Sequence, residues 1–66
     1  MERYDEAWTA IQRSISLGGD HAVIWEHYGD IATKLGIISE ARAGFKKALE
    51  SAPDNPEDIQ AKLNAL

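Results

Sequence analysis

The fold of this chain is decided by residues 22–55, which read AVIWEHYGDIATKLGIISEARAGFKKALESAPDN. In the first half of this stretch, Trp25, Tyr28 and Ala32 recur at intervals of three and four residues, so they share one face of a helix. Gly36 interrupts the pattern and can adopt the left-handed backbone that ends a helix. The second half resumes the helical interval with Ile38, Ala41, Phe45, Ala48, Leu49 and Ala52. The stretch therefore predicts two helices joined by a tight turn.

Further helix boundaries are predicted from glycine, proline and short polar side chains. Residues 18–19 are both glycine and follow an apolar-periodic run, and Pro53 cannot donate the backbone hydrogen bond that would continue a helix. Asp20, Ser39 and Asn55 are predicted N-caps, because short polar side chains accept hydrogen bonds from the first amides of a helix. Short connections make neighbouring helices antiparallel. The sequence therefore predicts an all-α stack of antiparallel helical hairpins, with helices near 2–17, 21–35, 39–52 and 56–65.

Length and composition restrict the chain to one small domain. Its 66 residues include no Cys, so neither a disulfide nor a thiolate metal site can stabilise the fold. Eleven Asp and Glu against seven Lys and Arg give a net charge of −4, which argues against a nucleic-acid partner. No apolar run approaches the ~20 residues of a membrane span. The first residues are too polar for a secretory signal, and we therefore expect a cytoplasmic location.

The sequence shows no motif for catalysis, for a cofactor or for a metal. Its serine and histidine residues have no nucleophile-and-base arrangement, so we expect a non-enzymatic protein without a cofactor. His21 and His27 are six residues apart, so on one helix they would point about 240° away from each other and could not share a metal ion. His27 with Glu26 and Asp30 forms a denser polar group. We interpret this group as a solvated helix face, since a zinc site needs three or four ligands.

The chain contains an internal repeat, because its residue pattern recurs at a constant offset. The offset that places Ala7 on Ala41 also places Ile11 on Phe45. The same offset relates Tyr4 to Ile38, Glu6 to Glu40, Ile15 to Leu49, Asp20 to Asp54 and Trp25 to Ile59. An offset of about 34 residues is the period of a helical-hairpin repeat, in which stacked hairpins bury a continuous core.

Residues 22–55 resemble the tetratricopeptide repeat, because nearly all signature positions of that family are present at the right spacing. These positions are Trp25, Tyr28, Gly29, Ala32, Gly36, Ala41, Phe45, Ala48 and Pro53. The resemblance divides the single domain 1–66 into the second helix of a partial repeat (1–19), a complete repeat (20–55) and a capping helix (56–66). It implies a non-catalytic protein–protein interaction module, as a fragment of a longer repeat protein.

The resemblance also implies a partner-binding groove along the first helix of the complete repeat. In similar proteins this helix lines a concave surface that holds a peptide or a partner segment. The corresponding residues here are Glu26, Asp30, Thr33 and Lys34, with Val23 and His27 at the edge of the groove. The alternative interpretation of this stripe is an ordinary solvated helix face. Family members that clamp the terminal carboxylate of a partner need Lys and Asn in this stripe, whereas this chain has Glu26 and Asp30. Two carboxylates repel an acidic tail, so we expect a basic or neutral partner.

A second hypothesis concerns the apolar stripe of the first predicted helix. Its members are Tyr4, Trp8, Ile11 and Ile15. In a repeat array these residues would pack against a helix that this chain does not contain, and an exposed apolar patch usually marks an interface. We therefore expect the isolated chain to form a homo-oligomer, either as a C₂ dimer or by exchange of helices. The alternative function is a self-assembling helical unit, natural or engineered, whose partner is a second copy.

Overall fold

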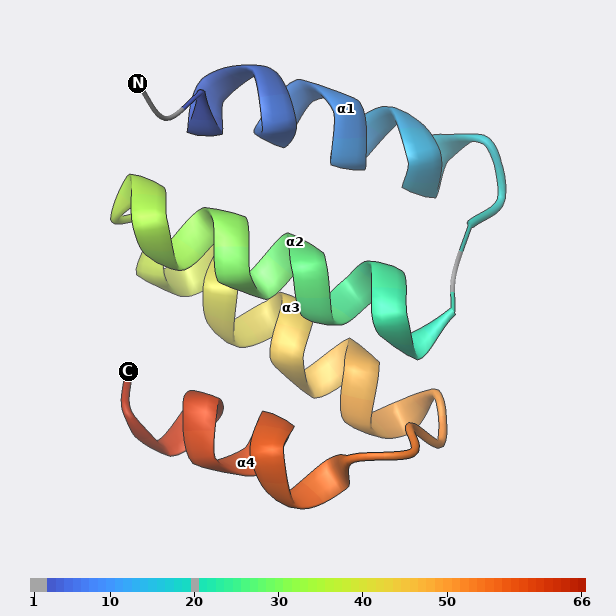
Figure 1. Cartoon of the computed structure of the whole chain (residues 1–66), viewed down its shortest axis with the longest axis vertical. Helices are drawn as coiled ribbons and strands as arrows, with labels where there is room; N and C mark the ends of the chain where they lie inside the picture. Colours follow the sequence, from blue (N-terminus) through green and yellow to red (C-terminus); the bar gives the residue numbers. More distant parts are fainter. Residues whose placement is uncertain (1–2, 20) are drawn as a thin grey trace.

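The computed structural model describes residues 3–19 and 21–66, and these residues form four α-helices (Figure 1). The helices are α1 (Tyr4–Ser16), α2 (Ala22–Leu35), α3 (Ile38–Glu50) and α4 (Pro56–Asn64). The pair α2 and α3 forms the centre, with α1 packed on α2 and α4 packed on α3. The described residues contain no strand, and the predicted all-α stack of antiparallel hairpins is confirmed.

The turn between α2 and α3 forms at Gly36, as the sequence predicts. Gly36 has a φ of 76°, a left-handed conformation that is sterically open to glycine. The amide of Ile37 donates a hydrogen bond to the carbonyl oxygen of Ala32 at 2.9 Å. This bond occupies a backbone carbonyl in the last turn of α2 and ends the helix at Gly36. α3 therefore begins at Ile38, with Ile37 in the N-cap position. The predicted N-cap at Ser39 is therefore wrong.

The segment between α3 and α4 departs from the prediction at one end. α3 ends at Glu50, earlier than predicted, and Ala52 adopts a left-handed conformation with a φ of 56°. Asn55 occupies the predicted N-cap position of α4, but its side chain makes no capping hydrogen bond. The predicted N-cap Asp20 lies outside the described residues, and His21 occupies the N-cap position of α2.

The core lies where α2, α3 and α4 meet. Its buried apolar residues are Tyr28, Ala32, Ala41, Phe45, Ala48 and Ile59. α2 and α3 come very close at two glycines. A β-carbon on Gly29 would lie 2.6 Å from the ring of Phe45, and one on Gly44 would lie 2.9 Å from the backbone nitrogen of Gly29. The sequence pattern identifies Gly29 but not Gly44, which forms the other half of this contact.

Aromatic rings attach α1 to the central pair of helices. The ring centroid of Trp8 lies 4.6 Å from that of Tyr28, and the ring of Trp25 meets Tyr28 edge-on at 5.3 Å. The hydroxyl of Tyr28 donates a hydrogen bond to the carboxylate of Glu40 on α3. Burial and this hydrogen bond together raise the pKa of Tyr28 to about 12, so the phenol stays protonated at neutral pH. Tyr28 therefore contacts both α1 and α3.

The helix boundaries repeat with the period of the sequence. α1 and α3 are both 13 residues long, and the offset from Tyr4 to Ile38 relates their ends as well as their starts. The same offset relates the start of α2 to the start of α4. The internal repeat therefore extends from residue types to helix placement, which is compatible with a stack of repeated helical hairpins.

Candidate functional site

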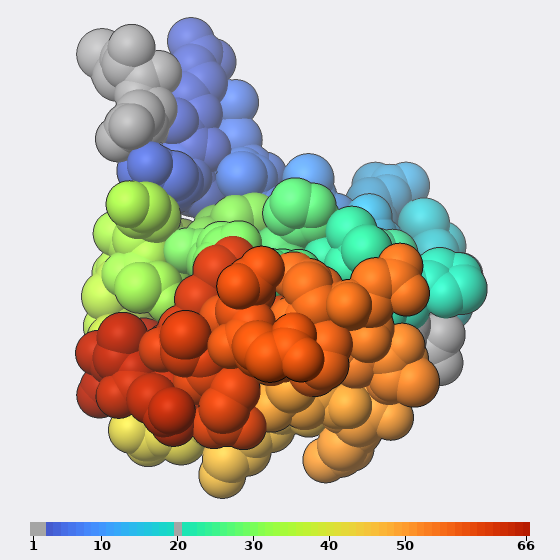
Figure 2. All heavy atoms as spheres, turned by 60° about the horizontal axis from the view of Figure 1, so that its bottom comes forward, coloured from blue at the N-terminus to red at the C-terminus, as the bar shows by residue number. Residues whose placement is uncertain are grey.

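A hollow of about 480 Å³ opens between the start of α1, the C-terminal half of α2 and the end of α4. Figure 2 views the molecule from the side of α4, with the N-terminal part of α1 standing above α2. The hollow is lined by Tyr4, Asp30, Ile31, Thr33, Lys34, Phe45, Lys62, Ala65 and Leu66. Its volume falls within the ~300–1,000 Å³ that is usual for ligand sites.

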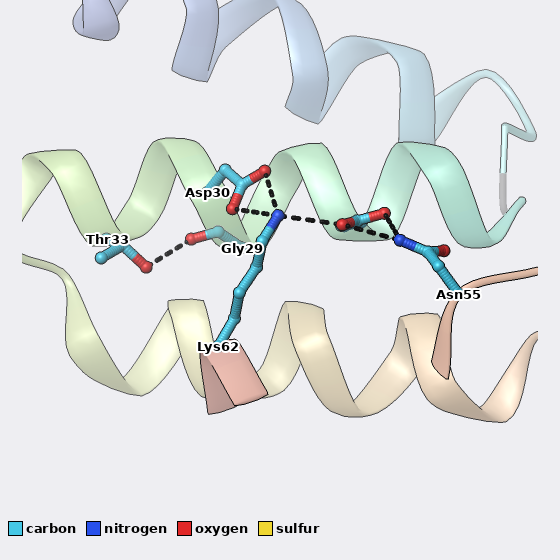
Figure 3. A network of polar contacts seen from close by, with 6 residues as sticks. Gly29, Asp30, Thr33, Asn55 and Lys62 are labelled. Carbon is cyan, nitrogen blue, oxygen red and sulfur yellow. Dashed lines mark hydrogen bonds and ion pairs between the residues drawn. The ribbon is translucent and has the colours of Figure 1, made fainter. Parts of the chain in front are cut away.

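The walls of the hollow are mostly apolar. Ile31 of α2, Phe45 of α3 and Leu66, which follows α4, supply aliphatic and aromatic surface. The hydroxyl of Thr33 donates to a backbone carbonyl oxygen of α2 at 2.7 Å, so it is already engaged inside the helix (Figure 3). A mostly apolar hollow with a few polar groups suits an apolar side chain of a ligand better than a highly charged one.

A lysine from α4 reaches across to two carboxylates on α2 (Figure 3). The ammonium of Lys62 lies 2.9 Å from Oε2 of Glu26 and 3.1 Å from the carboxylate of Asp30. The side-chain amide of Asn55 lies 3.4 Å from Oε2 of Glu26 and donates to it, so Glu26 is held from two directions. This polar network links α4 to α2 beside the hollow.

The network changes the proton affinity of two of its members. The hydrogen bond from Lys62 lowers the pKa of Glu26, and it outweighs the opposing effect of burial. Burial alone would lower the pKa of Lys62, but the hydrogen bonds to Glu26 and Asp30 raise it. The folded protein therefore favours an ionised Glu26 and a charged Lys62.

The predicted groove residues on α2 do not share one site. Asp30, Thr33 and Lys34 line the hollow at the C-terminal end of α2. Val23 lines a second, smaller hollow of about 230 Å³ near the other end of α2, beside the segment that precedes α4. Glu26 lies in the polar network with Lys62, and His27 is exposed and lines neither hollow. The sequence thus places six residues on one helix. In the folded protein they are divided between two hollows, the polar network with Lys62 and exposed surface.

The predicted self-association stripe lies in a different setting from the one expected. Tyr4, Trp8, Ile11 and Ile15 are all half-buried. Trp8 packs on Tyr28 of α2, so this stripe does meet a helix of the same chain, and the expectation that it lacks such a partner is wrong. Tyr4 lines the same hollow as Asp30, Thr33 and Lys34, so the structure brings members of the two predicted sets together.

Sequence reasoning misses the contribution of α4 to the site. Lys62 provides the cation of the polar network, and Ala65 and Leu66 form the far wall of the hollow. The internal repeat could have pointed to Lys62. Its offset relates Lys62 to Tyr28, and Tyr28 faces a neighbouring helix, so the repeat predicts that Lys62 does so as well. Its two partners lie 36 and 32 residues away in sequence, so local periodicity could not identify them.

Two other features are absent from the described part of the chain. Within residues 3–19 and 21–66, no three His, Cys, Asp or Glu side chains lie together in a way that could hold a metal ion. In the same residues, no helix has the length and apolar character that crossing a bilayer requires.

Comparison with known proteins gives one informative similarity. No protein-family model matches the chain, and no solved structure matches it. Calcineurin-binding protein 1 of Arabidopsis thaliana is 27% identical to the chain over 63 residues, which is 96% of the chain. The chain spans about 3% of the length of that protein. It is therefore similar to a short segment of a much longer protein.

Proposed function

We propose that this chain is a non-catalytic protein–protein interaction module of the tetratricopeptide-repeat type. The observation that carries the proposal is the hollow between α1, α2 and α4, which collects apolar surface and a few polar groups on a rigid helical frame. A preformed surface loses little conformational entropy when it binds a partner. The partner segment would place an apolar side chain in the hollow.

The repeat period supports the assignment to this type of module. The starts of α3 and α4 follow those of α1 and α2 at the same offset as the residue pattern does. The residues that resemble the family signature include the buried Tyr28, Phe45 and Ala48. In this proposal α1 is the second helix of a partial repeat, α2 and α3 form the complete repeat, and α4 is the cap. The Arabidopsis protein similar to this chain is named for binding calcineurin, which agrees with a protein-binding role in general.

The charges beside the hollow support a basic or neutral partner. Glu26 and Asp30 carry two negative charges against the single positive charge of Lys62, so the polar network itself keeps a negative excess, while Lys34 adds a positive charge elsewhere in the lining of the hollow. A bound segment with an acidic residue next to the polar network would be repelled by that excess, whereas a neutral or basic residue there would not. Tighter binding of an acidic peptide than of a matched basic peptide would contradict this part of the proposal.

Filling the hollow should abolish most of the binding. We expect Ala65→Trp to weaken the binding of a blocked neutral peptide with a central leucine by about tenfold, because the indole would occupy the space that the leucine needs. Ala65 is exposed and follows the last residue of α4, so the substitution leaves the core intact. Isothermal titration calorimetry measures the effect.

Ala43→Trp is the matched control for this substitution. Ala43 is exposed on α3 and does not line the hollow. Equal affinity of the peptide for the wild type and for Ala65→Trp would place the binding surface elsewhere. Equal losses in the two variants would show that the added tryptophan acts through aggregation or unfolding.

A second candidate function is self-association, and the exposure of α1 favours it. α1 has no buried residue, whereas four residues of its repeat counterpart α3 are buried. Ala10, at the position that corresponds to the buried Gly44, is exposed, and Leu17 next to α1 is 76% exposed. A second copy could cover this face of α1, which is separate from the stripe of Tyr4, Trp8, Ile11 and Ile15.

Solution mass tests this second candidate. If it holds, light scattering coupled to size exclusion will give a mass above the 7.3 kDa of one chain, and the mass will rise with concentration. Ala10→Arg should then return the mass to that of a single chain, since the charged side chain would stand in the contact. Thr9→Arg, on another face of α1, is the control. A single-chain mass at every concentration would reject self-association.

A further inference from the structure

We propose that Lys62 is an autoinhibitory side chain: it occupies the carboxylates of Glu26 and Asp30, and a basic group of a partner binds them only by displacing it. The proposal rests on the proposed function, because it concerns the regulation of the same hollow. The partner class is a segment that carries Arg or Lys next to an apolar anchor residue.

The contacts of Lys62 are those that a basic ligand would make. Its ammonium lies 2.9 Å from a Glu26 oxygen and 3.1 Å from the Asp30 carboxylate, both on α2 (Figure 3). Asp30 and Lys62 both line the hollow, so a ligand anchored there reaches the same carboxylate. Lys62 therefore stands where the cation of the partner would bind.

Lys62 can leave without detaching α4 from the stack. The side chains of Lys62 and Asp30 are 39% and 42% exposed, and an ion pair between partly solvated groups contributes little to stability. The Glu26 side chain is only 16% exposed, but it also accepts a hydrogen bond from Asn55, which stays in place when Lys62 leaves. α4 is held mainly by Ile59, which is fully buried, and by Leu63 and Leu66, which pack against the core. Exchange of one cation for another at Asp30 thus leaves the frame of the site in place.

An internal cation competes strongly because it belongs to the same chain. Its effective concentration at the two carboxylates is far above that of a free ligand. A basic group therefore gains little from Glu26 and Asp30 while Lys62 is charged and in place. Removing the charge of Lys62 exposes two negative charges to the ligand and should change the preference of the hollow from neutral towards basic segments.

The test compares the wild type with Lys62→Gln and with Lys46→Gln. Lys46→Gln changes the net charge by the same amount as Lys62→Gln. Lys46 is exposed on α3 and does not line the hollow, so its substitution leaves the polar network unchanged. The probes are two blocked peptides with the same central leucine, one with two flanking arginines and one with neutral flanks. We expect Lys62→Gln to bind the arginine peptide about tenfold more tightly than the wild type does, and the neutral peptide within about twofold. Lys46→Gln should bind both peptides as the wild type does.

Each result decides the proposal. An unchanged affinity of Lys62→Gln for the arginine peptide overturns it. An equal gain in Lys46→Gln also overturns it, because net charge rather than the contact would then be responsible. If the neutral peptide binds all three proteins, the proposed function stands in either case. If the neutral peptide binds none of them, the proposed function fails, and the arginine peptide still decides the role of Lys62.

A second measurement does not depend on a variant. In the wild type, the NMR signals of the Lys62 side chain should move towards those of a solvated lysine on saturation with the arginine peptide. They should stay in place with the neutral peptide. Signals of Lys62 that remain unshifted by a bound arginine peptide overturn the proposal.

Discussion

Gly44→Val should unfold much of the protein at room temperature. A β-carbon at this position would lie 2.7 Å from Cδ1 of Tyr28 and 2.9 Å from the backbone nitrogen of Gly29. A side-chain ring can rotate, but the backbone of α2 can move only if the two central helices separate. Overpacking at such a contact costs about 3 kcal/mol. A domain of this size has a free energy of unfolding of only ~3–5 kcal/mol, so the variant loses most of it.

Urea denaturation followed by circular dichroism measures this loss. Ala43→Val is the matched control, because Ala43 precedes Gly44 on α3 and is exposed. Valine is a poorer helix former than alanine, so the control should lose only about 0.5 kcal/mol. If Gly44→Val and Ala43→Val have the same midpoint, the close crossing of α2 and α3 does not limit stability and the described contact is wrong.

Ile59→Ala should release α4 from the stack and remove peptide binding. Ile59 is fully buried where α4 meets the core, and truncation of a buried isoleucine to alanine costs about 3 kcal/mol. α4 has nine residues, fewer than the ~12–15 that an isolated helix needs to be even marginally stable, so it should unfold once detached. The hollow would then lose the wall formed by Lys62, Ala65 and Leu66.

Amide hydrogen exchange distinguishes local release from global unfolding. We expect the amides of α4 in Ile59→Ala to exchange much faster than those of α2 and α3. Ile38→Ala is the control, because Ile38 is 41% exposed and its truncation should leave the protection of α4 unchanged. Wild-type protection of α4 in Ile59→Ala, together with unchanged peptide binding, would contradict the role assigned to Ile59.

Local sequence signals predict most of the helices because each signal acts within one or two turns. The spacing of Trp25, Tyr28 and Ala32 places them on one helix face, and Gly36 ends that helix in the left-handed conformation. The prediction fails at Ser39 for the same local reason. A capping side chain competes with the hydrogen bonds of the preceding turn, and the bond from Ile37 to Ala32 lets α3 begin earlier.

The site depends on contacts between residues that are far apart in the sequence. The stripe from Val23 to Lys34 follows from helical spacing, and three of its members do line the hollow. The wall contributed by α4 does not follow from spacing. It exists because buried Ile59 sets the position of α4, which brings Lys62 within hydrogen-bonding distance of Glu26 and Asp30.

The sequence by itself determined the all-α class, the repeat period and the helix that carries Glu26, Asp30, Thr33 and Lys34. These properties come from hydrophobic periodicity and from the backbone preferences of glycine and proline, which operate over a few residues. Only the tertiary structure decided that Trp8 packs within the chain and that Lys62 covers the two carboxylates. Both depend on how closely whole helices approach each other, and that distance is set at Gly29, Gly44 and Ile59 by packing across the core.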